Sequence, residues 1–209
     1  MKVVKLIALS VIFIASYAKA DGIILDGSKE ISNQNFKSNL EVLNPQSPIK
    51  NIKVDGDLKI KGYTVLENVS VDGELECIGS LRIINGNISS ARIKGNTVME
   101  NVKLDNLNLL GSLEANNLTV YKKAKIFGAT RLMNSKLNNL TVSTEVLTLH
   151  HTKIDDLVMT SAPSMREVVD LKSSSKVSNV TFYSNDGTVN IYDKDSSVGK
   201  VYGGSVVKK

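Results

Sequence analysis

The segment Thr97-Val-Met-Glu-Asn-Val-Lys-Leu-Asp-Asn-Leu-Asn-Leu109 belongs to a repeat that recurs along the chain at a fixed distance. A related copy begins 33 residues later at Thr130, and another begins 33 residues earlier at Thr64. Six of the nine residues in Thr64–Asp72 are identical to those in Thr97–Asp105. An internal period of this length is typical of repeat architectures, in which each repeat packs against its neighbours. The repeat therefore decides the fold.

A shorter unit lies inside the repeat: apolar, two polar residues, apolar, any residue, apolar. In Leu104–Leu109 the last two apolar residues are two apart and would share one face of a strand. The extra residue between Leu104 and Leu107 indicates a corner, which Asp105-Asn106 would occupy because short polar side chains tolerate left-handed backbone. Other copies are Leu137–Val142, Ile154–Met159, Val177–Phe182 and the variant Ala115–Val120.

A chain that repeats strand, corner and strand at this interval winds into a coil, and we call each complete turn of the coil a rung. Successive rungs would stack about 4.8 Å apart, as neighbouring strands do in a sheet. The sequence predicts an all-β protein with a single-domain parallel β-helix (β-solenoid) over residues 51–204, of roughly eight to nine rungs. Stacked asparagines would form amide ladders along the rod.

The competing fold is an antiparallel sandwich, which would join alternating strands by two-residue hairpin turns. Asn85-Gly86 and Asp186-Gly187 fit such turns, but they do not recur with the period. The repeat therefore favours the β-helix.

The first twenty residues have the pattern of a secretory signal peptide. Lys2 and Lys5 precede an apolar stretch, Leu6–Ser16, that is too short to span a bilayer as a helix. Ala18-Lys19-Ala20 is a small-x-small cleavage site. We therefore expect residues 1–20 to be removed and the protein to be exported to the periplasm, the outer-membrane surface or the exterior.

Three further segments stand apart from the repeat. Residues 21–50 lack the repeat and are expected to form an N-terminal cap, with loosely helical apolar spacing from Ile31 to Leu43. Residues 160–173 interrupt the rhythm, which predicts a longer rung or a protruding loop. After Gly203-Gly204 the pattern ends, and residues 205–209 are expected to be a tail.

Charge and cysteine content exclude some classes of function. Without the predicted signal peptide the chain has 23 basic and 21 acidic residues, a net charge of +2, and no basic stretch that predicts nucleic-acid binding. No later stretch is apolar and long enough for a transmembrane segment. Cys77 is the only cysteine, so no internal disulfide forms, and its apolar neighbours predict a buried, inert thiol. The alternative is an intermolecular bridge.

No residues combine into a strong catalytic, cofactor or metal motif. His150 and His151 are adjacent, so on a strand they would point to opposite faces and could not easily hold one metal ion. A glycan-cleaving site would need two carboxylates. The candidates are Asp155-Asp156 and the repeated position held by Asp72, Asp105 and Asn138. Because Asp and Asn interchange there, a corner role is favoured over catalysis.

Five Asn-x-Ser/Thr sequences would allow glycosylation, but the repeat itself produces this pattern at its corners. Their asparagines are Asn68, Asn87, Asn117, Asn139 and Asn179.

Three Gly-x-Leu sequences and the closing Ser196-Ser-Val-Gly-Lys-Val-Tyr-Gly-Gly204 resemble short-rung, bactofilin-like β-helix proteins and exported bacterial repeat proteins of uncharacterised type. The three are Gly56-Asp-Leu58, Gly73-Glu-Leu75 and Gly111-Ser-Leu113. Bactofilins themselves are cytoplasmic and have no cleavable signal. This chain differs from them in the signal-peptide pattern of its first twenty residues. The resemblance implies a rod-shaped, non-enzymatic scaffold that associates end to end.

Together these features predict an exported protein with a structural, self-assembly or adhesion role and no enzymatic activity. Its partner would be a second copy or a component of the cell envelope, and an uncapped C-terminal rung near Val198–Tyr202 would offer unpaired backbone. The alternative is a polysaccharide-binding or polysaccharide-cleaving β-helix. That alternative requires acids, arginines and aromatic residues to gather on one face; the candidate aromatics are Tyr121, Phe127, Phe182, Tyr183, Tyr192 and Tyr202.

Overall fold

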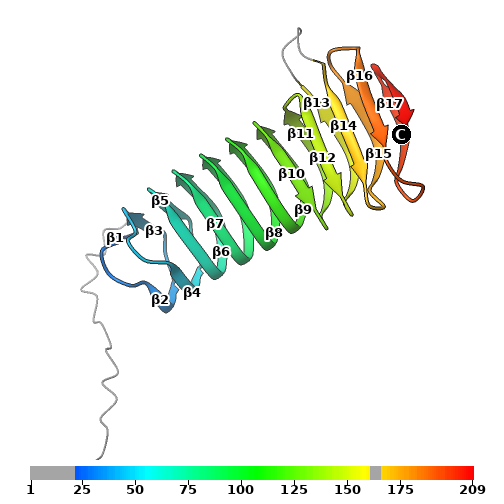
Figure 1. Ribbon diagram of the computed structural model, residues 1–209. Coiled ribbons are helices and arrows are strands. Elements are labelled where there is room, and N and C mark those ends of the chain that lie inside the picture. Colours follow the sequence, from blue (N-terminus) through cyan, green and yellow to red (C-terminus); the bar gives the residue numbers. More distant parts are fainter. Residues whose placement is uncertain (1–21, 161–165) are drawn as a thin grey trace, which may run out of the picture.

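The computed structural model describes residues 22–160 and 166–209, which form a rod built entirely of β-strands and their connections (Figure 1). The predicted signal peptide, residues 1–20, lies outside the described residues, as do residues 161–165 of the predicted 160–173 loop.

Eighteen strands form one continuous sheet that winds along the rod. They are β1 (Ile23–Asp26), β2 (Ser32–Phe36), β3 (Leu40–Leu43), β4 (Ile49–Val54), β5 (Leu58–Lys61), β6 (Thr64–Ile78), β7 (Leu81–Lys94), β8 (Thr97–Leu110), β9 (Leu113–Phe127), β10 (Thr130–Met133), β11 (Lys136–Ser143), β12 (Val146–His150), β13 (Lys153–Met159), β14 (Val168–Lys172), β15 (Lys176–Phe182), β16 (Gly187–Ile191), β17 (Ser197–Tyr202) and β18 (Gly204–Lys208).

Every strand pairing in the described residues is parallel, so the β-solenoid is confirmed and the antiparallel sandwich is wrong. One column of paired residues counts the rungs, because each rung contributes one member. The coil therefore has about 11 rungs rather than the eight to nine predicted. The column runs Ile23, Leu40, Leu58, Leu75, Ala91, Leu107, Ala124, Leu140, Leu157, Val180 and Val201.

The sequence underestimated the rungs because residues 22–50 follow the same coil without its repeat sequence. Strand β1 pairs with β3, and β2 pairs with β4, in the register that later rungs use. The helical spacing predicted from Ile31 to Leu43 is wrong: Leu40 and Val42 lie two apart and both point into the core, as in a strand. Whether this segment also caps the rod stays a prediction.

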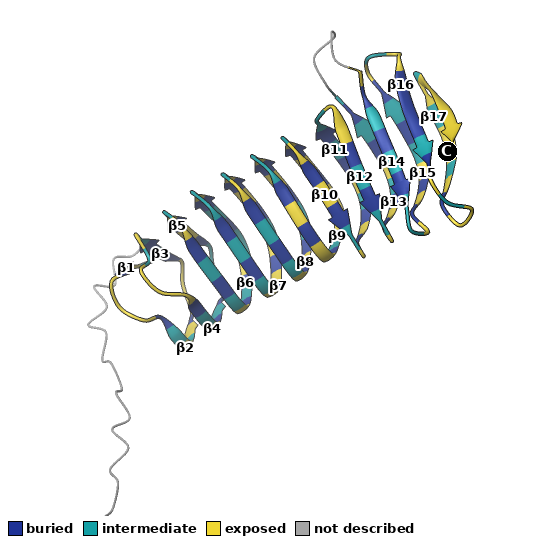
Figure 2. Ribbon diagram, viewed as in Figure 1, coloured by how far each residue is buried: buried dark blue, intermediate teal, exposed yellow. Residues whose placement is uncertain are grey.

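Each rung has three sides and three corners. In the rung of β8, the inward side chains lie in pairs on side 1 (Thr97, Met99), side 2 (Val102, Leu104) and side 3 (Leu107, Leu109). The first corner joins sides 1 and 2 at Asn101, the second joins sides 2 and 3 at Asp105-Asn106, and the third lies at Gly111-Ser112. Figure 2 shows the resulting alternation of buried and exposed residues along the strands.

The 33-residue period comes from an alternation within one buried column. On side 1, threonine and leucine occupy the same inward position in successive rungs, so the sequence repeats every second rung. Thr97 and Thr130 donate their hydroxyl protons to the carbonyls of Gly95 and Gly128, which satisfies these buried groups. The column is Thr64, Leu81, Thr97, Leu113, Thr130 and Leu147.

A column of glycines forms the third corner. Their φ angles lie between +118° and +146°, a region that side chains rarely adopt. A Cβ atom at Gly95 would lie 2.0 Å from the carbonyl oxygen of Gly79, so the stacked backbones leave no room for one. The column is Gly62, Gly79, Gly95, Gly111 and Gly128.

The first corner contains the predicted asparagine ladder. Each asparagine has left-handed backbone, and its Nδ2 donates to the Oδ1 of the asparagine one rung earlier, at 2.8 to 3.0 Å. Asp105-Asn106, the expected left-handed pair, does not have positive φ; the bend there is a register shift between neighbouring strands. The ladder is Asn33, Asn51, Asn68, Asn85, Asn101 and Asn117.

After β10 a buried hydroxyl ladder takes over from the amide bonds, the last of which joins the Nδ2 of Asn134 to the Oδ1 of Asn116 at 2.8 Å. Ser135 occupies the inward position that Val102 and Leu118 hold in earlier rungs. Its hydroxyl accepts a hydrogen bond from the backbone N–H of Leu118 and donates to the carbonyl of Met133. Thr152, Ser175 and Ser196 continue the same pattern.

We expect Gly95→Ala to destabilise the protein by about 3 kcal/mol or more, because the new Cβ would meet carbonyl oxygen at a positive φ. Gly62→Ala is the matched control, since its φ is +118° but the nearest atom to a Cβ is 3.7 Å away. Thermal unfolding of both variants checks this. Equal melting temperatures would contradict the crowding argument.

We expect Thr152→Val to cost about 1 to 3 kcal/mol, because it leaves the buried N–H of Ser135 without an acceptor. Thr152→Ser keeps the hydroxyl and loses one methyl group, so it should cost only about 1 kcal/mol. Urea midpoints of the two variants give the comparison. A serine variant as unstable as the valine variant would show that packing, not the ladder, matters at this position.

Candidate binding surfaces

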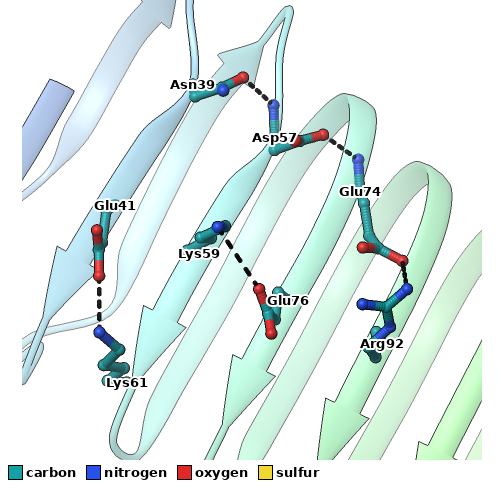
Figure 3. A network of polar contacts seen from close by, with 8 residues as sticks. All are labelled: Asn39, Glu41, Asp57, Lys59, Lys61, Glu74, Glu76 and Arg92. Atoms are coloured by element: carbon teal, nitrogen blue, oxygen red, sulfur yellow. Dashed lines mark hydrogen bonds and ion pairs between the residues drawn. The ribbon is translucent and has the colours of Figure 1, made fainter. Parts of the chain in front are cut away.

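Charged side chains tie neighbouring rungs together in the N-terminal half. Figure 3 shows Lys61 with Glu41 at 2.9 Å, and Arg92 with Glu74 at 3.3 Å, each pair joining two successive rungs. At the second corner, the side-chain oxygen of Asp57 accepts from the backbone N–H of Glu74 one rung later. Eight such ion pairs between rungs fall between residues 37 and 122.

The C-terminal half uses its charges differently. On side 2, Lys136 pairs in register with Lys153, and Lys153 with Lys176, so three exposed lysines stack in one column. Lys153 lies 3.7 Å from Asp155 of its own rung. Among the described residues, Lys136 and Lys176 have no ion pair. We call these three residues the lysine column.

More cations lie across the first corner from the lysine column. The pKa of His150 is lowered by burial and by the nearby charges of Arg131, Lys172 and His151. One acid is close, since Asp170 lies 4.0 Å from Lys172. We call the whole area the basic surface; its members are Arg131, Lys136, His150, Lys153, Lys172 and Lys176. A short motif in the sequence could have revealed the lysine column: a serine or threonine, then lysine, then an apolar residue. It occurs in three successive rungs, at Ser135–Leu137, Thr152–Ile154 and Ser175–Val177.

His151 takes the left-handed place at the first corner that asparagine holds in earlier rungs, with φ of 46°. Its role is therefore that of a corner residue next to the basic surface. Within residues 22–160 and 166–209, no three His, Cys, Asp or Glu side chains gather as metal ligands would.

The acids proposed for a cleavage site are spread along the rod and each has its own partner. Asp72 lies 3.1 Å from Lys53, and Asp105 lies 2.8 Å from Lys122. Asp156 accepts a hydrogen bond of 2.7 Å from Asn179. Asp72 and Asp105 share a corner but stand two rungs apart, roughly 10 Å by the strand spacing. The structure therefore does not pair Asp72 with Asp105, and the adjacent Asp155 and Asp156 are engaged by Lys153 and Asn179.

The sequon asparagines mostly use their amides within the coil. Asn68 and Asn117 are members of the amide ladder, and Asn139 donates to the carbonyl of Lys122. Attaching a glycan at these nitrogens would break bonds between rungs. These contacts support the interpretation that the repeat, not glycosylation, produces the sequons.

The aromatic residues do not gather on one face. Phe182 is buried, whereas Tyr121 lies at the second corner, Tyr183 at the third and Tyr192 near the first. Exposed aromatic side chains are Tyr63, Tyr121, Phe127, Tyr183, Tyr192 and Tyr202.

A groove of about 550 Å³ follows side 1 across six rungs, from Tyr63 to Thr148. Arg82, Val98, Glu114 and Arg131 hold the same outward position in four successive rungs and line it. Arg82 is held by Glu100 of the next rung at 2.5 Å. The sequence did not predict this groove, because outward residues of different rungs carry no shared motif.

The C-terminal rung is incomplete. Strands β17 and β18 pair only with β15 and β16, so their outer edges have no partner strand among the described residues. Val206 stands in the inward column of Val189 but is 45% exposed, because no further rung covers it. Figure 2 shows this end of the rod largely exposed.

No protein-family model, curated protein or solved structure matches this chain. The fold is that of a parallel β-solenoid. The resemblance to bactofilin-like proteins stays a prediction, and the Gly-x-Leu sequences behind it belong to two different corners. Gly56 and Gly73 lie at the second corner, whereas Gly111 lies at the third. In the described part of the chain, no helix could cross a membrane.

Cys77 should resist thiol reagents in the folded protein. Its side chain is fully buried on side 3, and burial raises its pKa to about 11, so little reactive thiolate forms near pH 8. An alkylating reagent at pH 8 should label the urea-unfolded chain and leave the native chain unlabelled.

The same shift sets a pH dependence. The unfolded chain releases this proton near pH 9.0 and the folded chain near pH 11, so stability should fall as the pH rises through this window. Rapid labelling of the native protein, or a flat stability profile in Cys77→Ala and wild type alike, would contradict the burial of the thiol.

Proposed function

We propose that this chain is an exported, non-enzymatic structural protein that associates end to end through its terminal rungs. The signal-peptide pattern of residues 1–20 supports export to the periplasm, the outer-membrane surface or the exterior. The incomplete C-terminal rung is the observation that carries the proposal of self-association.

The C-terminal rung offers both backbone and apolar surface to a partner. An edge strand presents a row of unpaired N–H and C=O groups, which a second strand can pair with. Val198 and Val201 are only half-buried and Val206 is more exposed still, although all three hold inward positions. Another rung placed on this end would bury them as it does in the middle of the rod.

The N-terminal rung of a second copy fits this end. Strands β1 and β2 pair only with β3 and β4, so they too have an open edge. The parallel coil could then continue from one molecule into the next.

Charge favours this head-to-tail arrangement over contact between two C-terminal ends. The last rungs carry exposed Lys200, Lys208 and Lys209, which would repel their own copies. The first rung carries exposed Asp26 and Glu30 and two lysines, Lys29 and Lys37, of which Lys37 lies 2.9 Å from Asp55 of the next rung. Opposite charges at the two ends would orient the molecules as they meet.

The polysaccharide-cleaving alternative gains no support from the acids, because each is engaged by a different lysine or amide. We therefore place the function in the rod and its ends.

The purified mature chain, residues 21–209, should form rods whose mass and length grow with concentration in light scattering and negative-stain microscopy. Val206→Pro should stop this growth. The amide of Lys209 donates to Ile191 in the preceding rung, and amides alternate along a strand, so the amide of Val206 faces outward. Proline there removes an outward donor and no bond within the molecule.

Val206→Thr is the matched control, since it keeps the amide and a branched side chain. We expect it to associate like wild type, while circular dichroism shows all three proteins equally folded. A wild-type chain that stays monomeric at high concentration, or a proline variant that still forms rods, would refute association through this end.

A further inference from the structure

The lysine column is an unusual use of charge in this fold. Like charges directly opposite each other on neighbouring strands destabilise a sheet. Elsewhere the chain avoids this cost, since Lys50, Lys53 and Lys122 each meet a carboxylate of the neighbouring rung at 2.8 to 3.1 Å. Side 2 of the C-terminal half instead aligns three ammonium groups.

The neighbouring groups add to this positive charge. Arg131 and Lys172 lie across the first corner, close enough to lower the pKa of His150 between them. The acids close to these cations are Asp155 beside Lys153, Asp170 beside Lys172, and Asp193, whose carboxylate accepts from the amide of Ser174 at the first corner. Three carboxylates therefore oppose five arginine and lysine cations, and the surface keeps a net positive charge.

We propose that the basic surface binds a linear acidic polysaccharide that lies along the rod axis. The rungs place cations at intervals of about 4.8 Å, which is comparable with the length of one sugar unit in an extended chain. A polyuronate has one carboxylate per sugar, so the carboxylates that face the rod can meet ammonium groups of the lysine column. This binding would neutralise the repulsion within the column.

The groups beside the column suit sugar rather than nucleic acid. Two residues after each lysine of the column, Asn138, Asp155 and Ser178 occupy equivalent positions in the three rungs. The amide nitrogen of Asn138 donates to the carbonyl of Tyr121, which leaves its oxygen, the carboxylate of Asp155 and the hydroxyl of Ser178 for sugar hydroxyls. Binding of single-stranded nucleic acid relies on successive aromatic platforms, and Tyr121 is the aromatic residue at this position, one rung earlier.

This proposal is independent of end-to-end association, because the lysine column lies on a side of the rod. The experiment is titration calorimetry of the mature chain with polygalacturonate oligomers, at a concentration where light scattering shows one fixed mass. We expect binding that weakens as salt is added, and no binding to dextran of similar length.

The variant Lys136→Gln/Lys153→Gln/Lys176→Gln should lose affinity by about tenfold or more. Its matched control, Lys94→Gln/Lys123→Gln/Lys125→Gln, removes the same charge from exposed positions on side 3 of earlier rungs and should bind like wild type. The column variant should melt no lower than wild type, since repulsion is relieved. Lys153→Gln alone gives a second, milder test of the same site.

Three results would overturn the proposal. The first is equal affinity of wild type and the column variant for polygalacturonate, or no binding by either. The second is equal loss in the control variant, which would indicate general charge attraction. The third is binding of a single-stranded DNA of the same charge, or of anionic phospholipid vesicles, as tight as that of the polyuronate.

Discussion

Stacking of each rung on the next, through parallel backbone hydrogen bonds about 4.8 Å apart, is the constraint on which this structure depends. It places every side chain directly above and below its counterparts in the neighbouring rungs, so each position must suit a column. At the third corner only glycine fits, since the carbonyl of Gly79 lies where a Cβ of Gly95 would be. At the first corner the polar side chains of one rung must form hydrogen bonds with groups of the neighbouring rung.

Two solutions to that requirement occur in one molecule. Asparagine amides carry both a donor and an acceptor, so an exposed ladder can extend from rung to rung without limit. Hydroxyls do the same in the interior, where Ser135 and Thr152 accept from backbone amides and donate to backbone carbonyls. The ladder ends at Asp193, whose carboxylate accepts from the hydroxyl of Ser196 and thereby has a lowered pKa.

Charged side chains also lie in columns, and their effect depends on whether neighbouring rungs carry opposite or like charges. Opposite charges in neighbouring rungs hold the N-terminal half together, as Figure 3 shows for Lys59 with Glu76. The like charges of the lysine column, in the C-terminal half, do not stabilise the stacking of its rungs. A column that the fold does not use for its own stability is available for a ligand of opposite charge.

The sequence predicted the features that repeat. Leu104–Leu109 and its copies indicated strands with corners, and stacked asparagines indicated an amide ladder, which the structure places at the corner of Asn101. It failed where a rung lacks the repeat sequence, so residues 22–50 were not recognised as rungs of the coil. It also assigned left-handed backbone to Asp105-Asn106 rather than Asn101, because both sites carry the same residue types. The groove on side 1 depends on outward residues from six rungs, which no local pattern relates.

If every rung is completed by its neighbours, the first and last described rungs each keep an open edge, and the amides of the last rung should report whether a partner completes it. Hydrogen exchange measured by mass spectrometry over a range of protein concentrations tests this directly. We predict that amides of β17 and β18 become protected as concentration rises, while those of β7 and β8 stay protected throughout. Exchange in β17 and β18 that is the same at every concentration would contradict the account.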